Sequence, residues 1–216
     1  MFIEFDKEYL RELFEQGRTG DKKHRYQPEV IRGYYKCIML LKRSANVEEL
    51  YRINSLNYEV LQGDKAGISS VRINRKYRLE FTVREVMNEQ IITVCRLATI
   101  TSSSDMETTK KIYAPHELIC AEPIHPGEML KDELQARGIS QRKFAGIIGM
   151  PYTAFNEIIN GHRPITTDTA LKIEAATGIT ANLWIGLQSD YNMQTARRDT
   201  GLSAVLDQIR KAVAVL

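Results

Sequence analysis

The chain has little of what metal centres, disulfide frameworks and membrane spans require. Its 216 residues include only three cysteines (Cys37, Cys95 and Cys120) and four histidines, and neither type is clustered. Without a CxxC spacing, we expect buried thiols in a reducing cytoplasm, no metal and no cofactor. We see no leader segment and no apolar run of membrane-spanning length, so a membrane protein is not expected.

What the chain does contain is enough apolar material for a normal core, since 43% of its residues are hydrophobic. The net charge of +3 is unevenly distributed. Residues 1–104 carry 18 Lys and Arg against 14 Asp and Glu, a balance of +4, and residues 105–216 carry 12 against 13, a balance of −1. Such an excess usually just solvates a surface, so it identifies a basic first half and no more.

The first half, residues 1–104, begins with a short apolar run at 2–5, which predicts a strand. Asp6 is expected to cap a helix that reaches about Gln16, and Pro28 to begin a second helix that reaches about Ser44. Alternating patterns separated by turn residues then predict strands at 58–61, 69–73, 77–84 and 90–97. We therefore expect an α+β domain of two helices and an antiparallel sheet.

A break follows, with the polar run Thr101–Asp105 and no long periodicity before Pro126. We place a linker at 105–123 and a second domain at 124–216. Helical spacing and glycine stops predict an all-α fold there, with helices near 126–137, 140–148, 151–160, 167–177, 180–190 and from 202. The last of these has an apolar stripe that needs a partner surface, in its own domain, in the first half or in a second subunit.

Residues 139–161 are typical of two short helices joined by a tight turn. Ser140 is a good N-cap, Gly149 provides the turn and Pro151 lies early in the next helix. The inner face of the first helix is assigned to Phe144, Ile147 and Ile148. The inner face of the second is assigned to Ala154, Phe155, Ile158 and Ile159. This pattern favours a helix-turn-helix unit, although an ordinary helical hairpin with a solvated face is the alternative.

The outer face of the second helix carries side chains suited to DNA. Asparagine pairs with adenine edges, threonine contacts a thymine methyl or a phosphate, tyrosine contacts a phosphate, and nearby cations neutralise phosphates. The predicted DNA-binding residues are Ser140, Gln141, Arg142, Tyr152, Thr153, Asn156, Asn160 and Arg163, with Lys143 beside them.

The runs Ile124–Leu134, Gly138–Gln141, Asn156–Gly161, Ile165–Leu171 and Asn182–Gln188 together closely resemble the HigA-like antitoxins, a branch of the repressor-type helix-turn-helix class. The resemblance covers residues 124–198. It implies a homodimer that binds operator DNA and represses its own operon, with recognition contacts at the outer face of the second helix. It also makes Trp184 and Leu187 core or dimer-contact residues.

The run Gly63–Gly67, followed by Ser69–Phe81, resembles the HigB-like toxins of the RelE superfamily, over roughly residues 1–100. The resemblance implies a RelE-like domain with ribosome-associated, metal-independent cleavage of mRNA. Its order, toxin before antitoxin, matches the usual gene order of this system. Since Met106 follows the polar run, we hypothesise that two adjacent reading frames have merged.

A hairpin in the first half would gather cations. If residues 74–76 form its loop, Arg72 lies opposite Arg78 on the polar face. Like charges paired across strands destabilise a sheet, which a protein tolerates more readily when an anion such as an RNA phosphate binds between them. The candidate catalytic residues are Arg72, Arg78, Lys76, Tyr77 and Glu59. Tyr77 is also expected to face inward, as a core residue.

One departure from the toxin pattern affects catalysis. Many members of that family carry a histidine near the end of the last strand, where this chain has Ile91–Thr101 and no histidine. General acid–base catalysis needs a group whose pKa lies near the working pH. Glu59 is a candidate base, and only Arg96 or a lysine is available as an acid.

Three functions remain open. The first is a fused toxin–antitoxin protein in which the second half binds DNA and holds the first inhibited in cis. The second is an active ribosome-dependent endoribonuclease with a tethered inhibitor. The third is a transcription regulator whose degenerate toxin domain serves only in assembly.

Overall fold

The computed structural model describes residues 1–99 and 118–214. The polar run at 101–105, Met106, most of the predicted linker and Leu216 lie outside the described residues. The first half is α+β, as predicted. Its helices and strands are β1 (Phe2–Phe5), α1 (Glu8–Gln16), α2 (Pro28–Arg43), α3 (Val47–Leu50), β2 (Glu59–Val60), β3 (Ile68–Arg72), β4 (Tyr77–Val86) and β5 (Glu89–Thr99).

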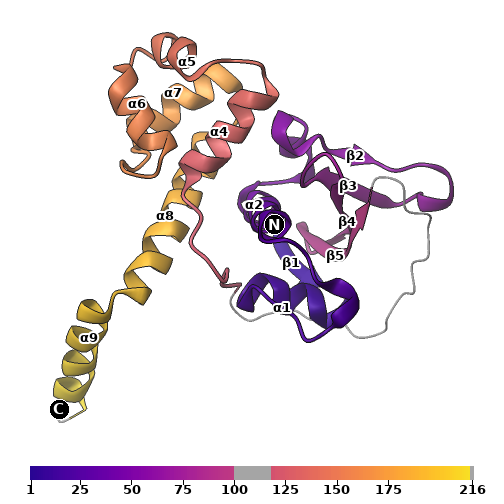
Figure 1. Cartoon of the computed structure of the whole chain (residues 1–216), viewed down its shortest axis with the longest axis horizontal. Helices are drawn as coiled ribbons and strands as arrows, with labels where there is room; N and C mark the ends of the chain where they lie inside the picture. The colour runs from indigo at the N-terminus through magenta and orange to yellow at the C-terminus, as the bar shows by residue number, and fades with distance from the viewer. Residues whose placement is uncertain (100–117, 215–216) are drawn as a thin grey trace.

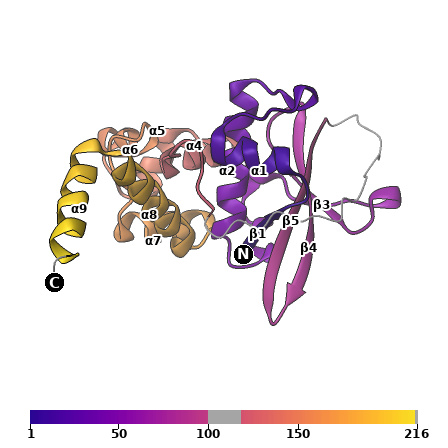
Figure 2. The same cartoon turned by 90° about the horizontal axis from the view of Figure 1, so that it is seen from below.

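The sheet has the order β1-β5-β4-β3-β2. The predicted antiparallel sheet is confirmed for β2 to β5, but β1 pairs in parallel with β5, so the sheet is mixed. A parallel neighbour needs a crossover, which α1 and α2 provide. These two helices lie on one side of the sheet (Figure 2) and cover its apolar face, where Val71, Leu79 and Phe81 are fully buried.

The β3–β4 hairpin has the predicted register. Val71 pairs with Leu79 and Arg72 with Arg78. The amide of Ile73 donates to the carbonyl of Tyr77 at 3.0 Å. Inside the loop, the Asn74 side chain accepts from the amides of residues 76 and 77 at 2.9 and 2.8 Å. An asparagine that bonds to the backbone two residues on is a common turn device, and here it sets the register that places the two arginines together.

The described part of the second half is helical. Its helices are α4 (Pro126–Ala136), α5 (Gln141–Ile147), α6 (Tyr152–Ile159), α7 (Thr167–Thr177), α8 (Ala181–Arg198) and α9 (Thr200–Val213). Helix α8 continues eight residues beyond the predicted end at 190. Trp184 and Leu187 are each 1% exposed, so both are core residues of this chain.

Two local predictions were wrong. Helix α1 begins after Lys7, and no side chain caps it, so Asp6 is not its N-cap. Ile147 is 55% exposed, whereas Phe144 and Ile148 of the same helix are buried. Ile147 is the last residue of α5 and lies on its solvent side, away from the face to which Phe144 belongs.

Helix α2 lies between the sheet and the second half, where α4 and α8 pack against it (Figure 1). We call this contact of α2 with α4 and α8 the seam. The end of the predicted linker also packs against the first half. Cys120 is buried, and the amide of Ala121 donates to the carbonyl of Phe14 at 2.7 Å. Arg198 of α8 donates to the carbonyls of Cys120 and Ala121 at 3.1 and 2.6 Å.

All three cysteines are buried free thiols. Burial raises the pKa of the Cys95 thiol to about 11 and that of Cys37 and Cys120 to about 12. Within residues 1–99 and 118–214, no group of three or more metal-ligating side chains is close enough to hold an ion. No helix of these same ranges combines the length and apolar character that a membrane crossing requires.

Candidate nucleic-acid interfaces

Helices α5 and α6 form the predicted helix-turn-helix unit. The Ser140 side chain accepts from the amide of Lys143 at 3.3 Å, which caps α5. Gly149 has a φ of +61°, a conformation that glycine adopts without steric cost, and it turns the chain into α6. Phe144 and Phe155 pack against each other with ring centroids 5.5 Å apart. The two helices are therefore fixed to each other through their buried faces.

Side-chain amides form hydrogen bonds with one another on the exposed side of this unit. The Asn156 amide donates to the side chain of Gln141 at 3.2 Å, which links α6 to α5. The Asn160 amide donates to the carbonyl and to the side-chain oxygen of Asn156 at 2.9 and 3.0 Å. Gln141, Asn156 and Asn160, which are all predicted to contact DNA, thus form one network of hydrogen-bonded side-chain amides. Such a network holds the asparagine edges in place before any base arrives.

The remaining predicted DNA contacts surround this network, except Ser140, whose hydroxyl is used by the α5 cap. Tyr152 and Thr153 are exposed in the first turn of α6, and the Arg142 guanidinium lies 4.9 Å from the Tyr152 ring centroid. This stacking holds both at the N-terminal end of α6, where helix dipole and cation together favour a phosphate. Arg163 is paired with Glu157 at 2.7 Å, with both side chains about half exposed, so it is the weaker phosphate candidate.

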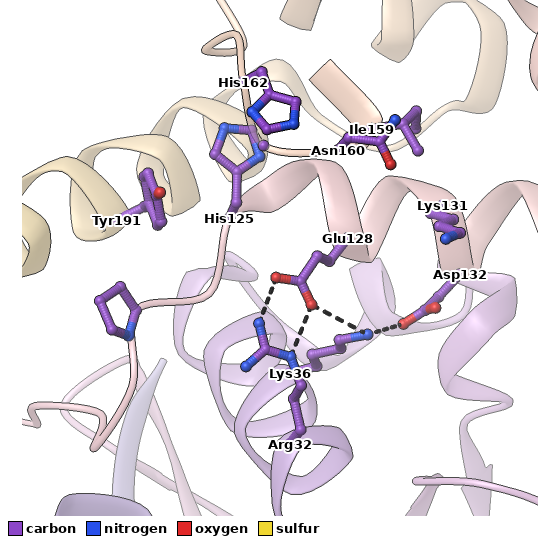
Figure 3. A pocket seen from close by; sticks show the side chains of 12 residues that line it. Arg32, Lys36, His125, Glu128, Lys131, Asp132, Ile159, Asn160, His162 and Tyr191 are labelled. Atoms are coloured by element: carbon purple, nitrogen blue, oxygen red, sulfur yellow. Dashed lines mark hydrogen bonds and ion pairs between the residues drawn. The ribbon is translucent and has the colours of Figure 1, made fainter. Parts of the chain in front are cut away.

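The rear of α6 rests on α4, and this contact is very close. A Cβ added to Gly127 would lie 1.9 Å from the carbonyl oxygen of Ile158. His125 caps α4 by accepting from the Gly127 amide through Nδ1 at 3.0 Å, and Tyr191 packs edge-on against its ring at 4.8 Å. Burial lowers the pKa of His125. His125 and Tyr191 also line a cleft of about 500 Å³ between α4, the end of α6 and the seam (Figure 3).

The seam is made largely of charge pairs. Arg32 of α2 meets Glu128 of α4 through two hydrogen bonds of 2.6 and 3.0 Å, which raise the pKa of Arg32. Lys36 bonds Asp132 at 2.7 Å, as Figure 3 shows. Arg43 pairs with Asp190 of α8. Basic side chains of the first half thus meet acidic side chains of the second. The uneven charge of the two halves was visible in the sequence, but not the pairs themselves.

The second candidate interface is the arginine face, formed by Glu59, Ser70, Arg72 and Arg78 on the side of the sheet away from α2. Arg72 is exposed. It lines the small cavity on this face and also a second cleft, which Asp132 of α4 lines too. Arg78 lies 3.5 Å from Glu59 and 3.4 Å from the Ser70 hydroxyl, and its Nε is buried without a partner. Glu59 is therefore held as the counter-ion of Arg78.

The other two toxin-site candidates are less central. Lys76 is exposed at the hairpin tip, with its ammonium 5.5 Å from the Tyr77 ring centroid. Tyr77 is half-buried, packs edge-on against Tyr26 at 5.7 Å, and still lines the small cavity beside Arg72 and Arg78. Its inward placement is confirmed in part, because one edge of the ring remains on the arginine face.

Sequence reasoning missed a buried ion cluster next to this face. Glu80 is completely buried and bonds Lys65 at 2.9 Å and Arg96 at 2.7 Å. A signal was present, since a strand that alternates Arg78, Leu79, Glu80, Phe81 places the carboxylate on the same side as the arginine. A buried carboxylate requires cationic partners, and the adjacent strand supplies one.

Comparison with known proteins finds matches in the second half. Residues 130–184 match the helix-turn-helix family. Virulence-associated protein I of Dichelobacter nodosus is 36% identical over 77 residues, which are 35% of this chain and 71% of that protein. Antitoxin HigA-1 of Vibrio cholerae is 33% identical over 76 residues, again 35% and 71%. The solved Pseudomonas aeruginosa antitoxin HigA with higBA promoter is 34% identical, with 41% of this chain and 91% of that chain covered and a TM-score of 0.36.

Proposed function

The chain belongs, through its second half, to the helix-turn-helix family of HigA-like antitoxins and DNA-binding transcription regulators, and we propose that it is a fused toxin–antitoxin protein that represses its own operon. In this proposal the second half reads operator DNA. The first half is a mRNA-cleaving toxin fold that the second half holds inhibited in cis.

The observation that carries operator binding is the preassembled amide network of Gln141, Asn156 and Asn160 on the exposed side of α5 and α6. A bidentate asparagine–adenine pair contributes about 1–3 kcal/mol of discrimination between bases. Tyr152 and Arg142, stacked at the start of α6, are placed for the neighbouring phosphates.

The test of this assignment is binding of the full chain to DNA from upstream of its own gene, at fixed salt. Asn156→Ala should weaken specific binding by roughly 5- to 150-fold, the equivalent of one lost base contact. The matched control is Asn182→Ala, since Asn182 is exposed on α8 and belongs to neither α5 nor α6. Equal affinity of both variants and the parent would remove the amide network from the interface.

The toxin half of the proposal rests on the arginine face. Arg72 and Arg78 are cross-strand partners, and both line the small cavity that Glu59 and Ser70 also line. Two guanidinium groups there would stabilise the charge that develops on a scissile phosphate. The missing histidine leaves Glu59 as the nearest candidate base, and Glu59 is already paired with Arg78.

Inhibition in cis is supported by the position of α4. Its residues Asp132, Gln135 and Ala136 line the same cleft as Arg72 and Arg75. An RNA strand that reaches Arg72 from this side meets the second half of the chain. Because the two halves are linked, the effective concentration of the inhibitor reaches the millimolar range, so α4 stays beside this edge of the hairpin unless the chain is cut.

Growth of a bacterial host that expresses residues 1–104 alone tests this part. The fragment should arrest growth, whereas the full chain and an Arg72→Ala/Arg78→Ala fragment should not. Circular dichroism of the purified fragments provides the folding control. If a folded fragment is harmless, the first half has no toxin activity and the protein is a regulator that carries a relic toxin domain.

A further inference from the structure

A short 3-10 helix of the first half, η2 (Asn54–Leu56), is held at its start by the second half. The two side-chain oxygens of Glu133 on α4 accept from the amides of Asn54 and Ser55 at 3.0 and 2.8 Å. The first amides of a helix have no partner inside that helix. Ile53, the residue before η2, has no side chain that could cap it. Glu133 therefore supplies from α4 the cap that the first half does not provide for η2.

The other end of η2 leads to the arginine face. Asn57 follows η2 with a left-handed φ of +44°, and its side-chain amide donates to one carboxylate oxygen of Glu59 at 2.8 Å. The second oxygen of Glu59 lies 3.5 Å from the guanidinium of Arg78. Glu59 belongs to β2, which has two residues and lies at the edge of the sheet (Figure 1). So short a strand adds few ladder bonds, and the position of Glu59 depends on the turn before it.

The carboxylate of Glu59 contacts Arg78 in the way that an RNA phosphate would. Carboxylate and phosphate are oxyanions that a guanidinium binds through the same N–H donors. The neighbouring carboxylate of Glu80 is buried between Lys65 and Arg96, whereas the side chain of Glu59 is 47% exposed. An ion pair exposed to this extent is weak. A phosphate can therefore replace Glu59 at Arg78 once the carboxylate is able to move away.

From these contacts we infer that Glu59 is a built-in competitor of RNA phosphate at Arg78, and that the second half holds it there through Glu133 and η2. The inference rests on the proposed RNA site of the arginine face and names how that site is regulated. It assigns Glu59 to this competition and not to proton transfer. Helix α4 thus acts on the arginine face without covering it, since this face lies on the side of the sheet away from α2 and the second half.

The test is binding of the full chain to a fluorescein-labelled single-stranded 2′-O-methyl RNA, which cannot be cleaved through its 2′-hydroxyl, by fluorescence anisotropy at fixed salt. Glu59→Gln keeps an acceptor for Asn57 and removes the charge, so it should bind this RNA about 3- to 10-fold more tightly than the parent. The matched control is Glu85→Gln. It removes the same charge from an exposed residue of β4, about 23 Å along the strand from Arg78, and should bind like the parent.

Combined variants identify the residues through which the effect acts. Glu59→Gln should give no gain in an Arg78→Ala chain, because the competition is for this guanidinium. Glu133→Gln weakens the cap of η2, so it should tighten RNA binding alone but add nothing to Glu59→Gln, whereas independent effects would add. Asn57→Gly keeps the left-handed backbone and removes the bond to Glu59, so it should also tighten binding without a change in the second half. Circular dichroism is the folding control for each chain.

The competition is overturned if Glu59→Gln gains no RNA affinity, if its gain persists in the Arg78→Ala chain, or if no chain binds the RNA. Full additivity of Glu133→Gln and Glu59→Gln would overturn the control by the second half. These results are distinct from failure of the toxin proposal. If residues 1–104 arrest growth but Glu59→Gln gains nothing, the toxin proposal stands and the competition fails. If that fragment is harmless and Glu59→Gln gains affinity through Arg78, the toxin proposal fails and the competition stands.

Discussion

Helix α4 contacts the first half and α6 by different chemistry. Toward the first half it presents carboxylates, with Glu128 on Arg32 and Asp132 on Lys36. Toward α6 it presents a bare backbone, with Gly127 against the carbonyl of Ile158. The seam therefore carries charge pairs, and the contact inside the second half is closely packed.

The difference between these two contacts bears on whether the two halves are separately folded units. Interfaces between separately folded units keep many charge pairs, whereas a single core is apolar and close-packed. The seam has charge pairs of the first kind beside buried apolar side chains that continue from one half to the other, and the α4–α6 contact has the second character. This is the pattern expected of two partners that are joined by a linker, and it supports the proposal that toxin and antitoxin have fused.

The largest effect is expected where α4 contacts residues 54–55 of the first half. Glu133 of α4 is 1% exposed and accepts from the amides of Asn54 and Ser55 at 3.0 and 2.8 Å, and it also bonds Arg137 at 2.7 Å. Glu133→Ala removes all three bonds and leaves a partly buried guanidinium without its carboxylate. The free energy of unfolding should fall by about 3 kcal/mol, measured by urea denaturation.

The control for this substitution is Glu157→Ala, which breaks an ion pair of the same length on the surface of α6. Because both of its side chains are about half exposed, the loss should stay below about 1 kcal/mol. If Glu133→Ala costs no more than Glu157→Ala, this contact of α4 with the first half contributes little to holding the halves together, and the proposed inhibition in cis loses its structural support.

A substitution in the α4–α6 contact should cost less stability but should have a clearer effect on DNA binding. Gly127→Ala places a methyl group on the carbonyl of Ile158, so α6 must shift, at a cost of about 1–3 kcal/mol. Operator affinity should fall as well, since the displaced helix carries Asn156. Gly146→Ala on α5 meets no atom within 4 Å and should be neutral or stabilise by up to about 1 kcal/mol. Unchanged operator binding by a folded Gly127→Ala chain would show that α4 does not position α6.

The arginine hairpin could be predicted from the sequence because the residues that determine it lie close together in the chain. The Asn74 turn and the alternation of Val71, Arg72 and Leu79 determine the register without help from the rest of the chain. The α5–α6 unit was equally predictable, since caps, a positive-φ glycine and 3.6-residue spacing all lie within 25 residues. The inward assignment of Ile147 was wrong because an apolar residue at the border of a helix face can lie in the core or in solvent, and helical spacing alone does not distinguish the two.

The seam was not predictable in the same way. Nothing local assigns Glu128 to Arg32, which lies 96 residues earlier, and many other charged residues were equally available as partners. The parallel pairing of β1 with β5 and the burial of Glu80 depend on the same long-range information. The charge balance shows only that the two halves carry net charges of opposite sign. Which residues form the pairs depends on the fold.

The smallest predicted effect is the dependence of stability on pH through His125, the residue that caps α4. Its Nδ1 accepts from the Gly127 amide, so the ring must be neutral, and burial holds its pKa below the ordinary value near 6.5. Above that value neither the folded nor the unfolded chain binds the proton. Below it the unfolded chain binds the proton more readily, so the free energy of unfolding falls as the pH drops through this range.

Among the neighbours of His125, Glu128 opposes this shift and His162 adds to it, with burial the largest cause. His125→Asn keeps an acceptor at the N-cap and removes the titration. Urea denaturation at pH 7.5 and 5.5 should therefore show a smaller loss of stability for the variant than for the parent. Other titrating groups, such as Asp6, whose pKa burial raises, act in both chains and cancel from the difference. An equal loss in both chains would mean that the cap at α4 tolerates a charged ring, and that the packed contact is looser than the position of Gly127 implies.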